Sequence, residues 1–409
     1  MGIIREILNT QGHIRMSHPL SRSIVVSLLL IATMGVMSGI TVVSSLPLIS
    51  QTFSHIPHIE FLSKLMLTVP SIVIALLAPL AGVIVDRFGR LRPLYAGLLL
   101  FVIAGSSGFY LGNFYAILVG RALLGVSVAL LMTSSTALIG DYFNEEARHR
   151  FMSMQGMSVA IGGIVFITAG GYLAELHWTY PFLIYLLPLL FLPLMIKALY
   201  EPRKYRHDSR NELVEERLWP VYLTAFLSML LFYMLPTQLP YLIIDTLHGE
   251  PRTIGFVIAA AMVFNALVSR QYARLKRRLN YTQIYMITFL LFGFGLFVIS
   301  QVETVGELFF STLFIGSGFG LIFVNTNSWF LAVVPPHKRG KASGLLASSF
   351  FMGQFSSPLI FEPFVSAWGI QGLFLITAFI SMTLSLVLFL AAKLRRDPAE
   401  HDILSDKKG

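Results

Sequence analysis

Long apolar runs recur along almost the whole sequence, and they constrain the fold more than any other feature. About twenty apolar residues rise roughly 30 Å as an α-helix, which is the thickness of the hydrocarbon core of a bilayer. Runs of this length fall near residues 24–46, 61–83, 93–111, 114–139, 152–174, 178–199, 219–244, 253–271, 281–301, 306–333, 342–364 and 370–392. The sequence therefore predicts an all-α membrane protein with twelve transmembrane helices.

Composition supports this class and excludes others. Hydrophobic residues make up 55% of the chain and charged residues only 12%, whereas a soluble domain of this size has more polar surface to cover. The absence of cysteine excludes disulfides, thiolate metal sites and cysteine nucleophiles. We find no paired histidine and aspartate within a predicted span, no metal-ligand cluster and no nucleophile motif, so we expect neither an enzyme nor a bound cofactor or metal.

The distribution of basic residues predicts the orientation in the membrane. If both termini are cytoplasmic, 27 of the 30 lysines and arginines lie in the tails, in the cytoplasmic loops or at the helix ends that border them. The exceptions are Lys64 and Arg252 on the outer side and Arg121 within a span. The net charge of +9 is thus explained by membrane topology, and no nucleic-acid partner is expected.

The polar stretch 201–217 divides the chain into two halves of similar size. It predicts six-helix bundles over residues 24–200 and 218–393, joined by a cytoplasmic loop. Residues 1–23 are expected to form a cytoplasmic tether, either an amphipathic helix or a basic tail, and residues 394–409 a cytoplasmic tail. The segments around Arg148 and Arg339 echo one another, and internal duplication of this kind is a known plan of transporters.

A charged loop between the second and third spans carries the most specific motif. It contains Gly82, Asp86, Arg87, Gly89 and Arg90. This pattern resembles the signature G-x-x-x-D-R-x-G-R of the major facilitator superfamily, and the resemblance extends over the whole chain. It implies twelve helices in two six-helix bundles and places the chain near the drug-efflux-like branch.

The resemblance also implies that the loop is a conformational latch. In the family, the aspartate and arginine hold the two halves together on the cytoplasmic side, with an acidic residue at the end of the fourth helix, here Asp141. We expect Gly82 to allow a close helix approach, Gly89 to allow a tight turn, and Asp86 to face a helix start near Ser343. The simpler alternative is that these charges only flank a turn.

Arg121 is a charge within an otherwise apolar span. Together with Gly125 and Ala129 it resembles the family pattern R-x-x-x-G-x-x-x-A. Insertion of an arginine in mid-membrane costs about 2.5–3.5 kcal/mol, so such a residue lines a cavity or has a partner. Two roles remain open: contact with the substrate or a proton site, or bonding to backbone carbonyls that braces the helices.

The fifth span departs from the drug–proton antiporter pattern G-P-x-x-G-G. It keeps the paired glycines, Gly170 and Gly171, but has no Gly-Pro before them. The span remains glycine-rich at Gly156, Gly162 and Gly163, so we expect close helix packing there, while the missing Gly-Pro weakens the antiporter assignment.

Other polar residues within the spans are candidates for a substrate or coupling cavity. They are Gln238, Asn265, Asn325, Asn327 and Gln354, each of which could instead bond a neighbouring helix.

No acidic residue lies in the middle of a span, and Glu175, Asp245 and Glu362 near the outer ends are the candidates for proton coupling. A wet interfacial carboxylate is the alternative for each. With one buried arginine and no buried acid, we expect a neutral to positive cavity.

These features predict a secondary-active transporter. The favoured role is proton-driven export of a small polar, amphiphilic or anionic molecule, such as a siderophore, metabolite or antibiotic. The alternative is proton-coupled import of a small organic anion, and a membrane-embedded enzyme is a remote third. We expect a multi-pass monomer in the bacterial cytoplasmic (inner) membrane, with the lipid bilayer as its surroundings.

Overall fold

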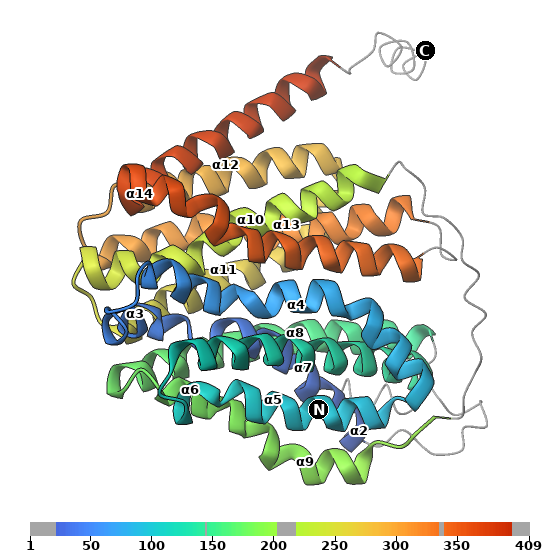
Figure 1. Ribbon diagram of the computed structural model, residues 1–409. Coiled ribbons are helices and arrows are strands. Elements are labelled where there is room, and N and C mark those ends of the chain that lie inside the picture. The colour runs from blue at the N-terminus through green and yellow to red at the C-terminus, as the bar shows by residue number, and fades with distance from the viewer. Residues whose placement is uncertain (1–21, 144, 203–217, 335–338, 395–409) are drawn as a thin grey trace, which may run out of the picture. The chain divides into compact units, whose positions relative to one another are not determined.

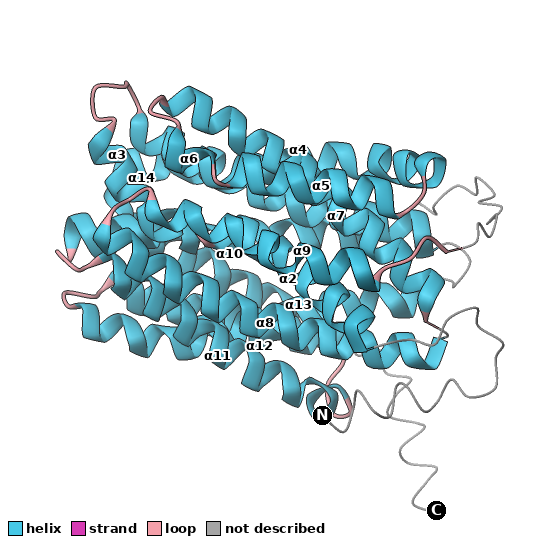
Figure 2. Ribbon diagram, turned by 90° about the horizontal axis from the view of Figure 1, so that it is seen from below, coloured by secondary structure: helices cyan, strands magenta, loops and turns pink. Residues whose placement is uncertain are grey.

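The computed structural model describes residues 22–143, 145–202, 218–334 and 339–394 (Figure 1). Every regular element in these ranges is a helix, as Figure 2 shows. The predicted tether 1–23, the loop 201–217 and the tail 394–409 fall almost entirely outside the described residues.

The helices of the first half follow the predicted spans. Their bounds are α2 Arg22–Ile40, η1 Val43–Ser45, α3 Leu46–Thr52, α4 Ile59–Phe88, α5 Leu91–Gly105, α6 Ser107–Tyr110, α7 Phe114–Tyr142, α8 Glu145–Leu176, η2 Tyr180–Leu186 and α9 Leu187–Ala198. Helix α4 continues through Pro70 and Pro79 without ending.

The second half has fewer but longer helices. They are α10 Trp219–Tyr241, η4 Leu242–Thr246, α11 Pro251–Lys276, α12 Tyr281–Ser300, α13 Val305–Val333 and α14 Arg339–Leu394. In α14 the backbone leaves the helical region at Gly369, with φ 71° and ψ 174°. Because this break falls between the predicted spans 342–364 and 370–392, α14 accounts for both of them.

The described residues contain eleven segments that are long and apolar enough to cross a membrane. The last of them, Ala342–Leu390, is 49 residues long and contains the break at Gly369. The predicted class of a multi-pass, all-α membrane protein is therefore confirmed.

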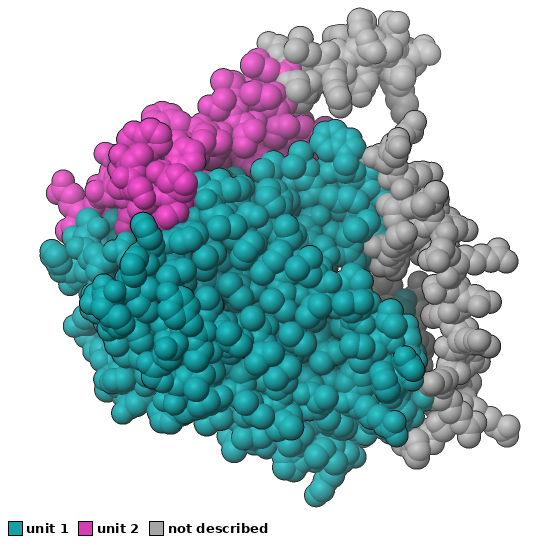
Figure 3. Space-filling view, in the orientation of Figure 1, with its two compact units in different colours: residues 1–259, 336–360 teal, residues 260–335, 361–409 magenta. Residues whose placement is uncertain are grey.

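The chain forms two compact units, coloured separately in Figure 3. Unit 1 comprises residues 1–259 and 336–360, and unit 2 comprises residues 260–335 and 361–409. This grouping differs from the predicted bundles 24–200 and 218–393, because α10 and the start of α11 pack with helices of the first half. The division into two six-helix bundles stays a prediction.

Close helix packing in unit 1 depends on glycine. Helix α4 packs along α7, and a Cβ added at Gly125 would meet the Pro70 carbonyl oxygen at 2.6 Å. A Cβ at Gly170 would meet the Thr41 carbonyl oxygen, and one at Gly171 would meet the backbone of Arg252 at 3.1 Å. The close packing expected at Gly125 is confirmed. Of the glycines expected to pack closely in α8, a Cβ at Gly162 would lie 3.1 Å from Thr33 Cγ2, whereas one at Gly156 would have no heavy atom within 4 Å.

In unit 2, α12 packs along α13. A small core of Tyr272, Ile284 and Leu321 joins α11, α12 and α13.

Candidate functional site

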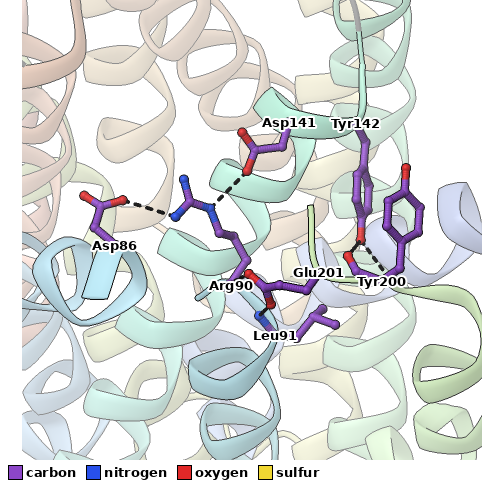
Figure 4. A network of polar contacts seen from close by, with 7 residues as sticks. All are labelled: Asp86, Arg90, Leu91, Asp141, Tyr142, Tyr200 and Glu201. Atoms are coloured by element: carbon purple, nitrogen blue, oxygen red, sulfur yellow. Dashed lines mark hydrogen bonds and ion pairs between the residues drawn. The ribbon is translucent and has the colours of Figure 1, made fainter. Parts of the chain in front are cut away.

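The charged loop joins the end of α4 to the start of α5. Gly89 ends α4 with φ 90° and ψ 174°, a conformation that side chains other than hydrogen strongly disfavour. The tight turn predicted at Gly89 is confirmed. The turn directs Arg90 toward the end of α7 (Figure 4).

Arg90 is the centre of the ion pairs in this loop. Its Nε donates to Asp141 Oδ2 at 3.0 Å, and its Nη1 lies 3.4 Å from Asp86 Oδ1. The Arg90 side chain is only 14% exposed, whereas Asp86 is 78% exposed and Asp141 27%. An exposed pair four residues apart on a helix contributes about 0.3–0.5 kcal/mol. The contact with Asp141 is therefore the better ordered of the two.

Glu201 also belongs to this network, and no sequence motif predicted it. Its Oε1 accepts the backbone N–H of Arg90 at 2.7 Å, and its Oε2 accepts that of Leu91 at 2.9 Å. A carboxylate at a helix N-terminus bonds free N–H groups and is favoured by the helix dipole. Its position directly after the sixth span was the available signal, but nothing in the sequence indicated its partner.

Tyr142 holds Tyr200, the residue before Glu201, in place. The Tyr142 hydroxyl donates to the Tyr200 carbonyl oxygen and accepts the Tyr200 N–H at 3.0 Å. Their rings lie 4.7 Å apart between centroids. Burial raises the pKa of the Tyr200 phenol, so it stays neutral at physiological pH. The start of the loop between the halves is thus attached to α7 and α5 (Figure 4).

One expectation for the latch is wrong in this conformation. A Cβ at Gly82 would have no heavy atom within 4 Å, so no helix of the described residues approaches closely there. Asp86 and Ser343 are both exposed, and the contact of Asp86 with a helix start stays a prediction. Arg87 lies beside the ring of Phe88, with its Cζ 5.5 Å from the ring centroid.

Arg121 is completely buried in unit 1. Its Nε donates to the Met66 carbonyl oxygen at 3.1 Å, its Nη2 to the Ser38 carbonyl oxygen at 2.7 Å, and its Nη1 to the Tyr185 hydroxyl at 2.9 Å. These bonds tie α7 to α2, α4 and η2. The geometry contains the bracing contacts that were one of the two predicted roles.

The surroundings of Arg121 leave its positive charge without a carboxylate. Within the described ranges, no acidic side chain lies at ion-pair distance from its guanidinium. A second phenol, that of Tyr233 from α10, lies within electrostatic reach of both Arg121 and Tyr185. The Tyr233 hydroxyl occupies the space beside Gly39, where a Cβ would lie 2.8 Å from it. Carbonyl and phenol oxygens stabilise a guanidinium but do not neutralise it.

Gln354 and Gln238, the other two cavity candidates in unit 1, differ in how many hydrogen bonds their side-chain amides make. Gln354 Oε1 accepts the Ser71 hydroxyl at 2.8 Å, and its Nε2 lies 3.8 Å from Met229 Sδ. Gln238 is fully buried, and neither amide atom has a hydrogen-bond partner among the described residues. A buried amide without partners is costly, so Gln238 is the candidate most in need of a ligand or water.

The three asparagines lie in unit 2 and bond nearby protein groups. Asn325 is fully buried, accepts the Tyr272 hydroxyl at 2.9 Å and donates to the Tyr281 carbonyl oxygen at 3.0 Å. Asn265 accepts the Ser269 hydroxyl at 3.2 Å, and Asn327 donates to a carbonyl of its own helix. These contacts account for the hydrogen bonds of Asn325 without a substrate.

The three candidate acids have different surroundings. Glu175 pairs with Arg252, Oε2 to Nε 3.5 Å, and Arg252 also pairs with Glu250. Asp245 is exposed, and its carboxylate interacts electrostatically with Lys64. Glu362 lies in unit 2 and is partly buried. Arg252, one of the exceptions to the charge distribution, is therefore paired with two acidic groups.

Membrane-crossing helices, a buried arginine and a charged turn at the helix ends define a transport protein as the general class. The chain belongs to the Major Facilitator Superfamily, whose family model matches residues 26–219 and 221–409. It is a multi-pass integral membrane protein and a transporter of this superfamily, as predicted.

Curated relatives are bacterial proteins named for resistance. Multidrug resistance protein 1 of Bacillus subtilis is 25% identical over 298 residues, covering 70% of this chain and 76% of the relative. The quinolone resistance protein NorA of Staphylococcus aureus is 23% identical over 296 residues, with the same coverage.

Solved structures share the fold. A bacterial homologue of the human lysosomal transporter Spinster, in an inward-facing and occupied conformation, matches with a TM-score of 0.75 and 16% identity over 92% of this chain and 98% of that one. A D-xylose–proton symporter matches with a TM-score of 0.68 and 17% identity over 87% of this chain and 97% of that one.

Proposed function

We propose that the protein is a proton-driven exporter of a small polar, amphiphilic or anionic molecule, and that it works as a monomer. Export is supported by the relatives, which are named for resistance to drugs and to quinolones. Resistance by a membrane transporter requires net movement of the compound out of the cell. Asp86, Arg87, Arg90 and Asp141 would act as the latch that opens and closes in each cycle, positioned by the turn at Gly89.

Arg121 carries the proposal on substrate class. Its guanidinium is fully buried, and its described partners are two carbonyl oxygens and a phenol, all of them neutral. A buried charge without a counter-charge is unfavourable. An anionic group of the substrate would supply that counter-charge, whereas a lipophilic cation would be repelled. Quinolones carry a carboxylate, which fits this requirement.

Asp245 is the first choice for the coupling proton. Glu175 already forms an ion pair with Arg252, which the release of Glu175 for coupling would have to break. Asp245 instead shares its surroundings with an amide and with the buried Lys64. Asp245 is exposed, and gain or loss of its proton would change the charge that faces the buried Lys64.

Transport in vesicles of known sidedness tests the proposal. We would load inverted membrane vesicles with an acid interior and compare uptake of a fluoroquinolone with that of its methyl ester and of a lipophilic cation. We expect concentration of the carboxylate compound at least tenfold above the ester, and loss of uptake with a protonophore. Preference for the cation would overturn the substrate class, and uptake only by right-side-out vesicles would establish the importer instead.

A further inference from the structure

Four arginines at the end of α11 and in the turn after it take no part in the proposed transport mechanism. They belong to a run of five basic residues, Arg270, Arg274, Lys276, Arg277 and Arg278. The sequence has no acidic residue between Glu250 and Glu303, so the run has no counter-charge nearby in the chain. All four arginines are exposed, and none forms an ion pair with an acidic side chain of the described residues.

One face of α11 packs against α13 and fixes how the helix is turned. Ser269 Oγ donates to the Gly320 carbonyl oxygen at 3.1 Å, and the Tyr272 hydroxyl donates to Asn325 Oδ1 at 2.9 Å. A Cβ at Gly320 would lie 2.6 Å from the Asn265 carbonyl oxygen. Because these α11 residues follow one another at intervals of four and three, they define a single face of the helix.

The opposite face of α11 carries an exposed stripe that changes from apolar to basic. It consists of Val263, Leu267, Arg270 and Arg274, which recur at intervals of four, three and four residues and so share one side of the helix. Val263 is 43% exposed and Leu267 55%. We call these four residues the α11 stripe. Its order, apolar side chains followed by cations, matches a phospholipid lying alongside with its acyl chain first and its phosphate last.

Aromatic residues indicate that the basic end of the stripe lies at the membrane surface. Tyr281 begins α12 just after the basic run, and its ring centroid lies 6.5 Å from that of Trp329. Tyrosine and tryptophan are enriched at the headgroup level of bilayers. The Lys276 Nζ lies 3.9 Å from the centroid of the Tyr281 ring, so this lysine is engaged within the protein. Arg274 donates at 2.8 Å to the side chain of Gln271, which is neutral and leaves the arginine charge uncompensated.

We propose that the α11 stripe binds an anionic phospholipid on the predicted cytoplasmic side. The guanidinium groups of Arg270 and Arg274 hold the phosphate, and Val263 and Leu267 contact an acyl chain. A guanidinium suits this role because its planar fork binds two phosphate oxygens at once. Clusters of basic residues next to a membrane span attract anionic headgroups. The inference goes beyond the proposed function, because it names a membrane partner and not a cargo.

The acidic residues of the C-terminal tail match the stripe less well. Residues 394–409 contain four acidic and four basic residues, so the tail brings no net negative charge. In phosphatidylglycerol, by contrast, no cation of the headgroup offsets the phosphate. Phosphatidylethanolamine has the same phosphate together with an ammonium group, and it is therefore the matched control lipid.

Photo-crosslinking with a lipid probe tests the site. The full-length protein would be placed in phosphatidylcholine nanodiscs that contain phosphatidylglycerol with a diazirine in one acyl chain, and the crosslinked peptides identified by mass spectrometry. We expect crosslinks within residues 260–281, and at least fivefold fewer with the corresponding phosphatidylethanolamine probe. Excess glycerol phosphate, which has no acyl chain, should not compete. Full competition by it would identify a soluble phosphate as the ligand and overturn the lipid.

Charge-removing variants at exposed positions complete the test. Arg270→Gln combined with Arg274→Gln should lower crosslinking within residues 260–281 at least tenfold. The corresponding pair of lysine variants keeps the charge but loses the planar fork, and should lower it two- to fivefold. Arg22→Gln combined with Lys197→Gln is the control, because it removes two exposed positive charges from other helix ends. Unfolding in lipid-free detergent checks that each pair is folded.

Three outcomes would overturn the lipid site. The first is undiminished crosslinking in the glutamine pair Arg270→Gln and Arg274→Gln, and the second is an equal fall in the control pair. The third is a rise of at least fivefold when the four acidic residues of the tail are neutralised, which would show that the tail occupies the stripe. Crosslinking does not depend on the transported compound, so a failure of the fluoroquinolone assay would leave the lipid site standing.

Discussion

Glu201 binds the backbone N–H of Arg90 at 2.7 Å, across 111 residues of sequence. The same carboxylate binds the N–H of Leu91, and thereby attaches the residues that follow α9 to the first turn of α5. The latch loop is therefore positioned from two directions, by Asp141 through the Arg90 side chain and by Glu201 through the backbone.

Glu201→Ala should reduce both stability and transport. It removes a carboxylate from a helix N-terminus, a change that costs about 0.5–2 kcal/mol. We expect a lower melting temperature in detergent and a severalfold lower transport rate, with Glu201→Gln intermediate because an amide oxygen can still accept one N–H. Glu303→Gln, an exposed acid of another loop, is the control. Equal effects in Glu201→Ala and the control would contradict the positioning role.

Gly89 and Gly82 should respond oppositely to alanine. Gly89→Ala forces a side chain into a positive φ and places its Cβ 2.8 Å from Glu201 Oε1, with a cost of about 1–3 kcal/mol. Gly82→Ala lies within α4 in open space and should stabilise the helix by about 0.5–1 kcal/mol. Thermal unfolding measures both.

Transport by Gly82→Ala adds a second measurement on the same variant. A stable protein that transports poorly would show that a helix approaches Gly82 in another conformation. A stable protein with normal transport would contradict the role of Gly82 in the latch.

Asp86→Asn should abolish transport with little effect on stability. The Asp86 side chain is 78% exposed and its ion pair with Arg90 is long, so its loss changes the free energy of unfolding by less than about 0.5 kcal/mol. We expect normal expression and binding but at least tenfold slower transport. Asp141→Asn should lower stability more, because its contact with Arg90 is shorter and less exposed. Full transport by Asp86→Asn would exclude the latch.

Arg121→Lys should separate bracing from substrate binding. Lysine keeps the charge but loses the planar fork that reaches Met66, Ser38 and Tyr185 at once. If the carboxylate of the substrate binds there, affinity for a fluoroquinolone falls at least tenfold while affinity for its ester changes little. Tyr185→Phe is the matched variant, since it removes one bond and no charge. An equal fall for acid and ester would assign Arg121 to bracing alone.

Asn325→Ala should destabilise unit 2 without changing substrate affinity. The change leaves the buried Tyr272 hydroxyl and the Tyr281 carbonyl oxygen without their partner, at about 1–3 kcal/mol. Asn327→Ala loses only a bond to its own helix and is the control. Thermal unfolding and ligand binding measure the two effects. Weaker substrate binding by Asn325→Ala with normal stability would contradict this prediction and indicate that Asn325 contacts the substrate.

Sequence reasoning predicted the helices well because the bilayer restricts the choice of structure. Each span needs about twenty apolar residues, and the turns between spans are rich in charged residues. Both features can therefore be recognised from a short stretch of sequence. The break at Gly369 and the turn at Gly89 follow for the same reason. Local rules of this kind do not specify which residues meet across the fold.

The contacts missed from the sequence are all long-range. Glu201 reaches α5, and Tyr241 reaches Ser50 across 191 residues. Lys64 was counted as an outer-side charge, but its burial depends on where α10 packs. Nothing in a run of residues indicates which conformation the helices adopt.

The discontinuity of unit 1 has a consequence for biosynthesis. Its helices α2 to α10 are made first, but residues 336–360 also belong to it, and Gln354 bonds Ser71 of α4. At about 5–20 residues per second, the ribosome needs roughly 6–24 seconds to pass from the end of α10 at Tyr241 to residue 360. During that interval the Ser71 hydroxyl and the faces of α4 and α10 that meet α14 must wait in the lipid or with an insertion factor. These uncovered faces of α4 and α10 are the surfaces that a chaperone for nascent membrane helices would bind.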